Sequence, residues 1–264
     1  MTIAARDLTL GYNGATIVPA LTLDIDLGQI TAVIGPNGCG KSTLLRGLLG
    51  LLPPRAGGVA LDGRPLRRWN ARALARRIAF LPQSPVAPEG LTVRQVVSHG
   101  RFAHQSLWAS QTEQDRRIVA EALDLTGLSH LGDRLFSTLS GGERQRGWIA
   151  LALAQRAAAV FLDEPTTFLD LGHQLEILDL LRQLNVERNI GIVMVLHDVN
   201  HAAAYADRII AMREGRLVAD GTGVEVVTAS LMRDLFGVSA DIRLLDGDGR
   251  QYPHCIPLAA HMRA

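Results

Sequence analysis

The chain has 264 residues, of which 47% are hydrophobic and 20% are charged, and its formal net charge is +1. This composition allows a packed core, either as one large domain or as a core with an inserted subdomain, and gives no indication of a nucleic-acid or anionic-membrane binder. Two cysteines, Cys39 and Cys255, are too few for a disulfide framework. The N-terminus lacks the apolar core of a signal peptide, and no apolar run approaches the roughly 18–20 residues that span a bilayer. We therefore expect a soluble cytoplasmic protein that needs a partner for any role at a membrane.

The first part of the chain alternates apolar and polar residues, a pattern typical of strands. A glycine-rich loop follows the third strand, and a helical pattern runs from that loop to two prolines. The predicted strands are Thr2–Tyr12, Thr22–Asp26 and Ile30–Ile34, and the predicted helix is Ser42–Leu52.

The next segments predict a change of architecture. Val59–Gly63 has the pattern of a hairpin edge, and Ile78–Leu81 that of a short strand. Between them, Arg64–Arg77 contains six arginines, which indicates a solvated helix face. From Thr92 to about Leu128 the pattern is helical and more polar, and we interpret this stretch as an inserted helical subdomain.

Strands then alternate with helices, which predicts a parallel sheet with helices on both faces. We expect a short helix and an irregular or stranded end beyond Ser230. The predicted elements are strands Ala159–Asp163 and Gly191–Leu196, helix Gly172–Arg188 between them, and a hairpin of Arg208–Met212 with Arg216–Asp220.

The loop after the third strand fits the phosphate-loop pattern G-x-x-x-x-G-K-[ST]. Its glycines let the backbone approach phosphate oxygens, and the following helix directs free N–H groups at the anion. Lys41 is the single lysine among 27 basic residues, and a slim ammonium fits where a guanidinium would not. Ser42 offers a hydroxyl to Mg²⁺. The residues expected to bind the nucleotide here are Gly35, Pro36, Asn37, Gly38, Cys39, Gly40, Lys41, Ser42 and Thr43.

An apolar strand ends in two acids, Asp163 and Glu164. Adjacent strand residues point to opposite sides, so the two carboxylates can have separate functions. Asp163 is the candidate for holding Mg²⁺ and its water shell, and Glu164 for polarising an attacking water.

A second glycine-rich segment, Leu139–Arg146, precedes the predicted helix Trp148–Gln155. Ser140 with Glu143 three residues later is a capping-box pattern. The segment therefore predicts a helix start, and Gly141 and Gly142 there also expose N–H groups to an anion.

With these motifs in this order, the sequence resembles the ABC transporter ATPases over nearly its whole length. The resemblance implies that Tyr12 stacks on adenine, that Gln83 contacts Mg²⁺ or the attacking water, and that His197 contacts the γ-phosphate. It also implies that Asp170 lies at a dimer seam. Glu143 stands where the family often has Gln, a change that the capping box tolerates.

The implied fold is an α/β P-loop (RecA-like) core with a mostly parallel sheet, an N-terminal antiparallel β subdomain and an inserted α-helical subdomain. The expected boundaries are 1–84 and 156–230 for the two parts of the ATP-binding core, 85–155 for the helical subdomain with the signature segment, and 231–264 for a C-terminal extension.

In this family the signature segment is Leu139–Arg146 here, and its Ser140–Gly142 part faces the nucleotide of the opposite subunit. One copy of each motif per chain therefore implies a homodimer with two sandwiched ATP molecules. A separate ATPase chain also implies permease subunits in the membrane, an indirect substrate-binding protein and a place at the cytoplasmic face of a bacterial inner membrane.

Finer resemblance, in Gly100–His104, Trp148–Gln155 and Leu196–Asp207, is to the ferric siderophore and vitamin B12 importers. Ferric siderophore is the first choice of cargo, with cobalamin, haem or another metal chelate as alternatives, and a non-transport ABC ATPase as a further one. Arg101–His104 lies where such ATPases receive the permease. A solvated helix end is the alternative interpretation of that segment.

Overall fold

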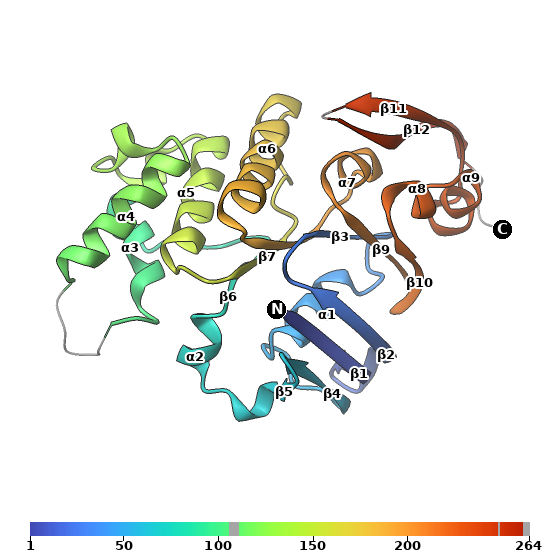
Figure 1. The fold of residues 1–264 in the computed structure, drawn as a ribbon, viewed down its shortest axis with the longest axis horizontal. Helices are drawn as coiled ribbons and strands as arrows, with labels where there is room; N and C mark the ends of the chain where they lie inside the picture. The colour runs from blue at the N-terminus through green and yellow to red at the C-terminus, as the bar shows by residue number, and fades with distance from the viewer. Residues whose placement is uncertain (106–110, 248, 261–264) are drawn as a thin grey trace. The chain divides into compact units, whose positions relative to one another are not determined.

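The computed structural model describes residues 1–105, 111–247 and 249–260 (Figure 1). They belong to two compact units, one formed by Met1–Arg68 with the chain from Gly191 onward, and one formed by Trp69–Ile190. The strands are β1 Thr2–Tyr12, β2 Ala15–Asp26, β3 Ile30–Ile34, β4 Ala56–Leu61, β5 Arg64–Pro65, β6 Ile78–Leu81, β7 Ala159–Asp163, β8 Gly191–Val195, β9 Arg208–Arg213, β10 Arg216–Gly221, β11 Val238–Gly247 and β12 Arg250–Ala260. The α-helices are α1 Lys41–Leu48, α2 Ala71–Ala75, α3 Val93–Ser98, α4 Glu113–Leu125, α5 Gly141–Ala154, α6 Leu171–Arg188, α7 Val199–Tyr205, α8 Gly223–Val226 and α9 Ala229–Leu231.

The first unit begins with an antiparallel sheet in the order β2-β1-β4-β5. Alternate residues of β1, among them Ile3, Leu8 and Leu10, are buried, and α1 packs on β1 and β2. The contact is close, because a Cβ at Gly47 of α1 would lie 2.2 Å from a methyl carbon of Leu10. The predicted antiparallel β subdomain is confirmed, and the predicted strand Thr22–Asp26 is the second half of β2.

The same unit contains parallel strands, in which β3 pairs with both β8 and β9. Every residue of β3 and β8 is buried, as expected for strands covered on both faces. β9 and β10 form the predicted antiparallel hairpin.

The C-terminal part of this unit is a π-helical turn, Met232–Phe236, followed by the hairpin β11–β12. β12 packs on α7, where the Asn200 amide donates to the carbonyl of Cys255 (3.1 Å) and accepts from its N–H (2.7 Å). The stranded end expected beyond Ser230 is thus a regular hairpin.

The second unit combines two parallel strands with a group of helices. β6 pairs with β7, and α3, α4 and α5 pack on one another, as Figure 1 shows in green. Each of these three helices begins with a capping box, at Thr92, Thr112 and Ser140. The predicted helical subdomain is confirmed for the described residues, and its boundaries at 85 and 155 stay predictions.

The main difference from the predicted elements is the arginine-rich segment 64–77. It is not one solvated helix but β5, a 3₁₀ turn at Leu66–Arg68 and the short helix α2. Pro65 pairs with Ala60 in the sheet, and a new helix starts only where the Asn70 side chain accepts from the N–H of Ala73 (2.7 Å).

Two helix bounds also differ from the sequence prediction. α1 ends at Leu48 and not at Leu52, because the N–H groups of Leu51 and Leu52 turn back to the Arg46 carbonyl around Gly50, which has a φ of 70°. α5 begins at Gly141, well before Trp148, because the Ser140 capping box starts it there.

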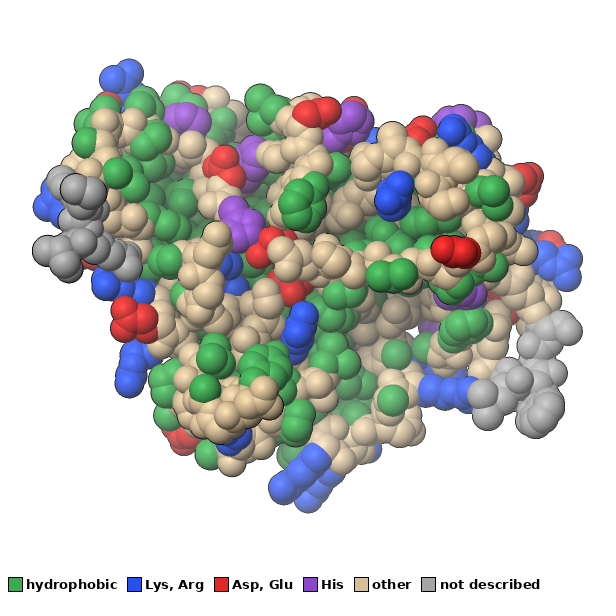
Figure 2. Space-filling model, turned by 180° about the vertical axis from the view of Figure 1, so that it is seen from behind, with side chains coloured by type: hydrophobic (Ala, Val, Ile, Leu, Met, Phe, Trp, Pro, Cys, Tyr) green, Lys and Arg blue, Asp and Glu red, His purple; other side chains and the backbone are tan. Residues whose placement is uncertain are grey.

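Charged side chains of both signs are interspersed over the face that Figure 2 shows, in keeping with the small net charge. Among the helices that the structure describes, none combines the length and hydropathy needed to cross a bilayer.

Candidate functional site

The loop between β3 and α1 folds as a tight cradle. Gly35, Gly38 and Gly40 have φ values of 149°, 76° and 103°. A Cβ at Gly35 would lie 2.2 Å from the Met212 carbonyl oxygen, so only glycine fits there. Gly40 is the N-cap of α1, whose first N–H groups therefore emerge from the loop. This geometry is that of a backbone anion site at a helix start.

Lys41 lies within this loop. Its side chain is 5% exposed, and its ammonium donates to the carbonyls of Gly35 (2.8 Å) and Pro36 (3.0 Å). The positive charge is thus held at the inner side of the turn, next to the helix N-terminus, where it adds to the field that favours an anion. Neighbouring Cys39 is buried, and burial raises the pKa of its thiol, so the thiol stays neutral.

Two more predicted residues belong to the same unit. Tyr12, at the end of β1, is 41% exposed, which leaves its ring available for stacking. His197 lies two residues after the end of β8 and is exposed, and Asp198 after it caps α7. Both therefore lie at strand ends with accessible side chains.

The second unit brings Gln83 and Glu164 together. β6 and β7 run parallel, so the segments that follow them emerge at the same edge. The Gln83 amide nitrogen lies 2.5 Å from Oε2 of Glu164, and the hydroxyl of Thr167 donates to the same oxygen at 3.1 Å. Thr167 had no role in the sequence interpretation, although it comes three residues after Glu164.

The two acids have different environments, as their adjacent positions predicted. Asp163 is 2% exposed at the end of β7, whereas Glu164 is half-buried and has a φ of 57°. A left-handed conformation is unusual for a glutamate and turns the chain sharply out of the strand. The turn directs the Glu164 carboxylate towards Gln83 and Thr167, apart from the buried Asp163.

The signature segment forms the start of α5. The Ser140 hydroxyl accepts from the N–H of Glu143 (3.3 Å), and the Glu143 carboxylate accepts from the N–H of Ser140 (2.8 Å). The backbone N–H of Ser140 first, and then its side chain, stabilise the Glu143 carboxylate and lower the pKa of Glu143. Gly141 and Gly142 therefore occupy the first turn of a 14-residue helix whose N-terminal dipole favours an anion.

A histidine that the sequence interpretation did not use supports this segment. A Cβ at Gly142 would lie 2.2 Å from Cδ2 of His173, so the imidazole rests directly on the signature glycine. Nδ1 of His173 is 2.8 Å from the carboxylate of Asp170, which also caps α6 by accepting from the N–H of His173 (2.9 Å). These bonds, the backbone one first, lower the pKa of Asp170. Asp170 and the signature are thus linked within one unit.

The α/β fold and the lysine-bearing cradle define a P-loop nucleotide-binding protein. The ABC transporter family model matches residues 18–167. The chain is 45% identical over 240 residues to the iron(3+)-hydroxamate import ATP-binding protein of Bacillus subtilis (strain 168), covering 91% of this chain and 89% of that one. It is 44% identical over 256 residues to the ferric enterobactin transport ATP-binding protein of Escherichia coli (strain K12), covering 97% and 94%.

Solved structures agree with these matches. A metal-chelate type ABC transporter in an inward-facing conformation has a TM-score of 0.84 at 31% identity, covering 98% of this chain and 97% of that one. A dimeric ATP-binding cassette in a post-hydrolysis state, bound to ADP and Pi, has a TM-score of 0.73 at 27% identity, covering 83% and 98%. The chain belongs to the ABC transporter family and is an ATP-binding ATP hydrolase.

Proposed function

We propose that this chain hydrolyses ATP to drive the uptake of ferric siderophore through a separate permease. The observation that supports this most is the 44–45% identity to import ATP-binding proteins for two chemically different ferric siderophores. That identity spans 91–97% of the chain, including regions outside residues 18–167 of the family match. Shared function is a better explanation of such extended identity than a shared fold alone.

In this proposal two copies of the chain sandwich two ATP molecules and contact permease subunits at the cytoplasmic face of the inner membrane. A substrate-binding protein delivers the cargo to the permease. The segment Arg101–His104 receives the permease, and the exposed Phe102 within it offers an apolar contact. ATP closes the dimer and hydrolysis opens it, which is a nucleotide-biased two-state switch.

Within each ATP site, the loop Gly35–Thr43 wraps the phosphates and Lys41 neutralises their charge. Tyr12 stacks on the adenine, a contact of about 1–3 kcal/mol. Ser140–Gly142 of the opposite subunit contributes the N-terminal end of α5, and Asp170 lies at the seam between the subunits.

The residues expected to hold Mg²⁺ suit that ion. Ser42, Gln83 and Asp163 supply a hydroxyl, an amide and a carboxylate, which are the hard oxygen donors that Mg²⁺ prefers. When bound, Mg²⁺ would offset the negative charge of the β- and γ-phosphates. The burial of Asp163 gives its carboxylate the fixed position that such a ligand needs.

Glu164 acts as the general base for the attacking water. Gln83 and Thr167 both donate to its carboxylate, so they orient it at the end of β7. His197 contacts the γ-phosphate from the end of β8. A positioned base contributes roughly 10²–10⁴ in rate. Glu164→Gln should therefore bind ATP but hydrolyse it at least about 100-fold more slowly than wild type.

The test is uptake of radiolabelled ferric hydroxamate and ferric enterobactin by cells that lack this gene. Complementation with wild type should restore uptake of at least one siderophore, complementation with Glu164→Gln should not, and the matched control Glu187→Gln, on the exposed face of α6, should behave as wild type. Restored cobalamin or haem uptake, with no effect on either siderophore, would instead assign the alternative cargo. Rapid hydrolysis by purified Glu164→Gln would contradict its role as the base.

A further inference from the structure

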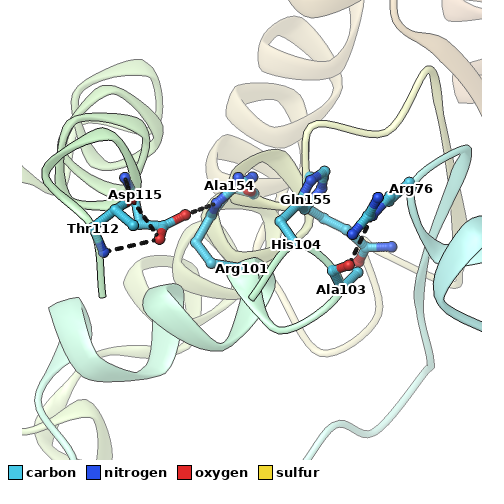
Figure 3. A network of polar contacts seen from close by, with 8 residues as sticks. All are labelled: Arg76, Arg101, Ala103, His104, Thr112, Asp115, Ala154 and Gln155. Atoms are coloured by element: carbon cyan, nitrogen blue, oxygen red, sulfur yellow. Dashed lines mark hydrogen bonds and ion pairs between the residues drawn. The ribbon is translucent and has the colours of Figure 1, made fainter. Parts of the chain in front are cut away.

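The segment His99–Gln105 is fixed against the C-terminal end of α5, as Figure 3 shows. A Cβ at Gly100 would lie 2.2 Å from the carbonyl oxygen of Leu151, so the two backbones approach as closely as glycine allows. The Arg101 guanidinium donates to the carbonyl of Ala154 (2.7 Å), one of the carbonyls that the end of a helix leaves without an intrahelical partner. The segment is therefore docked on α5 by both shape and charge.

Arg101 is also part of a buried ion pair. Its Nε lies 2.9 Å from Oδ1 of Asp115, and the two side chains are only 6% and 7% exposed. Asp115 in turn closes the capping box of α4 with Thr112. Burial raises the pKa of Asp115, but the hydrogen bonds from Arg101 and Thr112 outweigh it and lower that pKa to about 2. Arg101 thus joins the segment to α4 as well as α5, and the interpretation of Arg101–His104 as a solvated helix end is wrong for Arg101.

A second set of bonds continues from the same segment to β6. His104 Nε2 lies 2.7 Å from the carbonyl oxygen of Gln155, and because a carbonyl only accepts, that nitrogen carries a proton. The Gln155 amide donates to the carbonyls of Ala75 and Ile78, and Nε of Arg76 donates to the carbonyl of Ala103 (2.8 Å). These contacts, drawn in part in Figure 3, make one polar network from α4 to the start of β6.

Both ends of this network lead to predicted ATPase residues. α5 begins at the signature segment, capped by Ser140, and the network holds its opposite end. β6 runs from Ile78, where Gln155 binds, to Leu81, two residues before Gln83. On the outer side, Phe102 is 61% exposed and stacks on His99 with ring centroids 4.8 Å apart. The segment His99–Gln105 therefore exposes an apolar side chain, Phe102, on its outer side. On its inner side it is hydrogen-bonded to the end of α5 and, through Gln155, to β6.

We propose that Arg101 is a positioning residue that transmits permease movement to the ATPase. A permease pressing on Phe102 displaces a segment that cannot slide on α5 or α4, so the force moves the signature end of α5 and the Gln83 end of β6. Apolar residues of similar volume would stabilise the fold about as well as the Arg101–Asp115 pair. The pair therefore matters for the single geometry in which it holds the segment. This inference rests on the proposed function, because it needs a permease.

The test compares ATP hydrolysis with transport in vesicles that contain the permease and its binding protein. The main variant is Arg101→Met with Asp115→Asn, which removes the ion pair without leaving an unpaired buried charge. Arg101→Lys keeps the charge but not the planar fork that reaches both partners. The matched control is Arg117→Ala, whose pair with Glu113 on α4 is exposed.

We expect the double variant to keep its permease-free ATPase rate within about twofold and to lose at least about tenfold in transport per ATP hydrolysed, with Arg101→Lys in between. The control should match wild type. If the folded double variant transports as much cargo per ATP hydrolysed as wild type, the proposal is overturned. The same holds if its hydrolysis and transport fall in proportion, because that result indicates a merely structural role.

Hydrogen exchange of the isolated protein separates this proposal from the siderophore assignment. The N–H groups of Phe102, His104 and Gln105 bond within the segment, to the carbonyls of His99 and Arg101. They should exchange at least about tenfold faster in the double variant than in wild type. Unchanged exchange would refute the rigid attachment, whatever the permease does. A wild type that no siderophore permease stimulates would refute the proposed function and not the attachment.

Discussion

Replacing Arg101 by alanine should lower the free energy of unfolding by about 3–5 kcal/mol, the usual effect of removing one partner of a buried ion pair. In the structure the Asp115 side chain is 7% exposed, and the Arg101 guanidinium bonds both its carboxylate and the Ala154 carbonyl. Without the guanidinium, a carboxylate and a helix-terminal carbonyl remain in a place that water reaches poorly. Loss of the packed arginine stem adds to this effect.

The same helix provides the control. The Arg117–Glu113 pair on α4 is 78% and 66% exposed with a 3.4 Å separation, so Arg117→Ala should cost about 0.5 kcal/mol or less. Urea unfolding of both variants, followed by tryptophan fluorescence, measures the difference. If Arg101→Ala lies within about 1 kcal/mol of Arg117→Ala, the burial argument is wrong. Recovery of most of the loss in Arg101→Met with Asp115→Asn would show that the unpaired charge is the cause.

Three further predictions concern pH and the phosphate loop. The pKa of Asp115 is about 2 in the folded state and 3.8 when unperturbed, so the stability that the ionised carboxylate contributes is present above about pH 4 and is lost as the pH falls towards 2. In acid unfolding, Asp115→Asn should therefore lose less stability than wild type between about pH 5 and 2.5. Lys41→Ala should weaken ATP binding at least about 10–100-fold in calorimetry, as expected for loss of charge-assisted bonds, whereas Arg46→Ala on the exposed side of α1 should not. Gly35→Ala should weaken ATP binding and cost about 1–3 kcal/mol of stability, because its Cβ meets the Met212 carbonyl; wild-type values would disprove that steric argument.

The strands and the phosphate loop were predictable because their signals are local. β3, β6 and β7 have the predicted bounds, since short apolar runs between turn residues are buried strands by composition alone. The Ser140 capping box, a pattern within four residues, predicted a helix start at the place where α5 begins, although the helix itself was predicted only from Trp148. The arginine-rich segment 64–77 was predicted wrongly, because its charge pattern gives no sign of the pairing between Pro65 and Ala60.

The contacts that support the candidate site were not predictable in the same way. Glu164 and Gln83 are 81 positions apart, and only the parallel pairing of β6 and β7 brings them together. His173 of α6 rests on Gly142 of α5, and a single sequence does not reveal that these two helices meet. Thr167 was within reach of the sequence interpretation, because it comes three residues after Glu164 and its N–H closes a turn on the Glu164 carbonyl.

By itself the sequence determined the class of protein. The phosphate loop, the paired acids and the signature are short patterns whose chemistry depends on neighbours along the chain, so residue type and spacing are enough to identify them. Only the tertiary structure decided that Arg101 is buried and paired with Asp115, and that Gln155 ties the end of α5 to β6. Burial and hydrogen-bond partners depend on which distant segments fold together. The presence of an arginine in a polar stretch therefore does not reveal whether its side chain is solvated or buried.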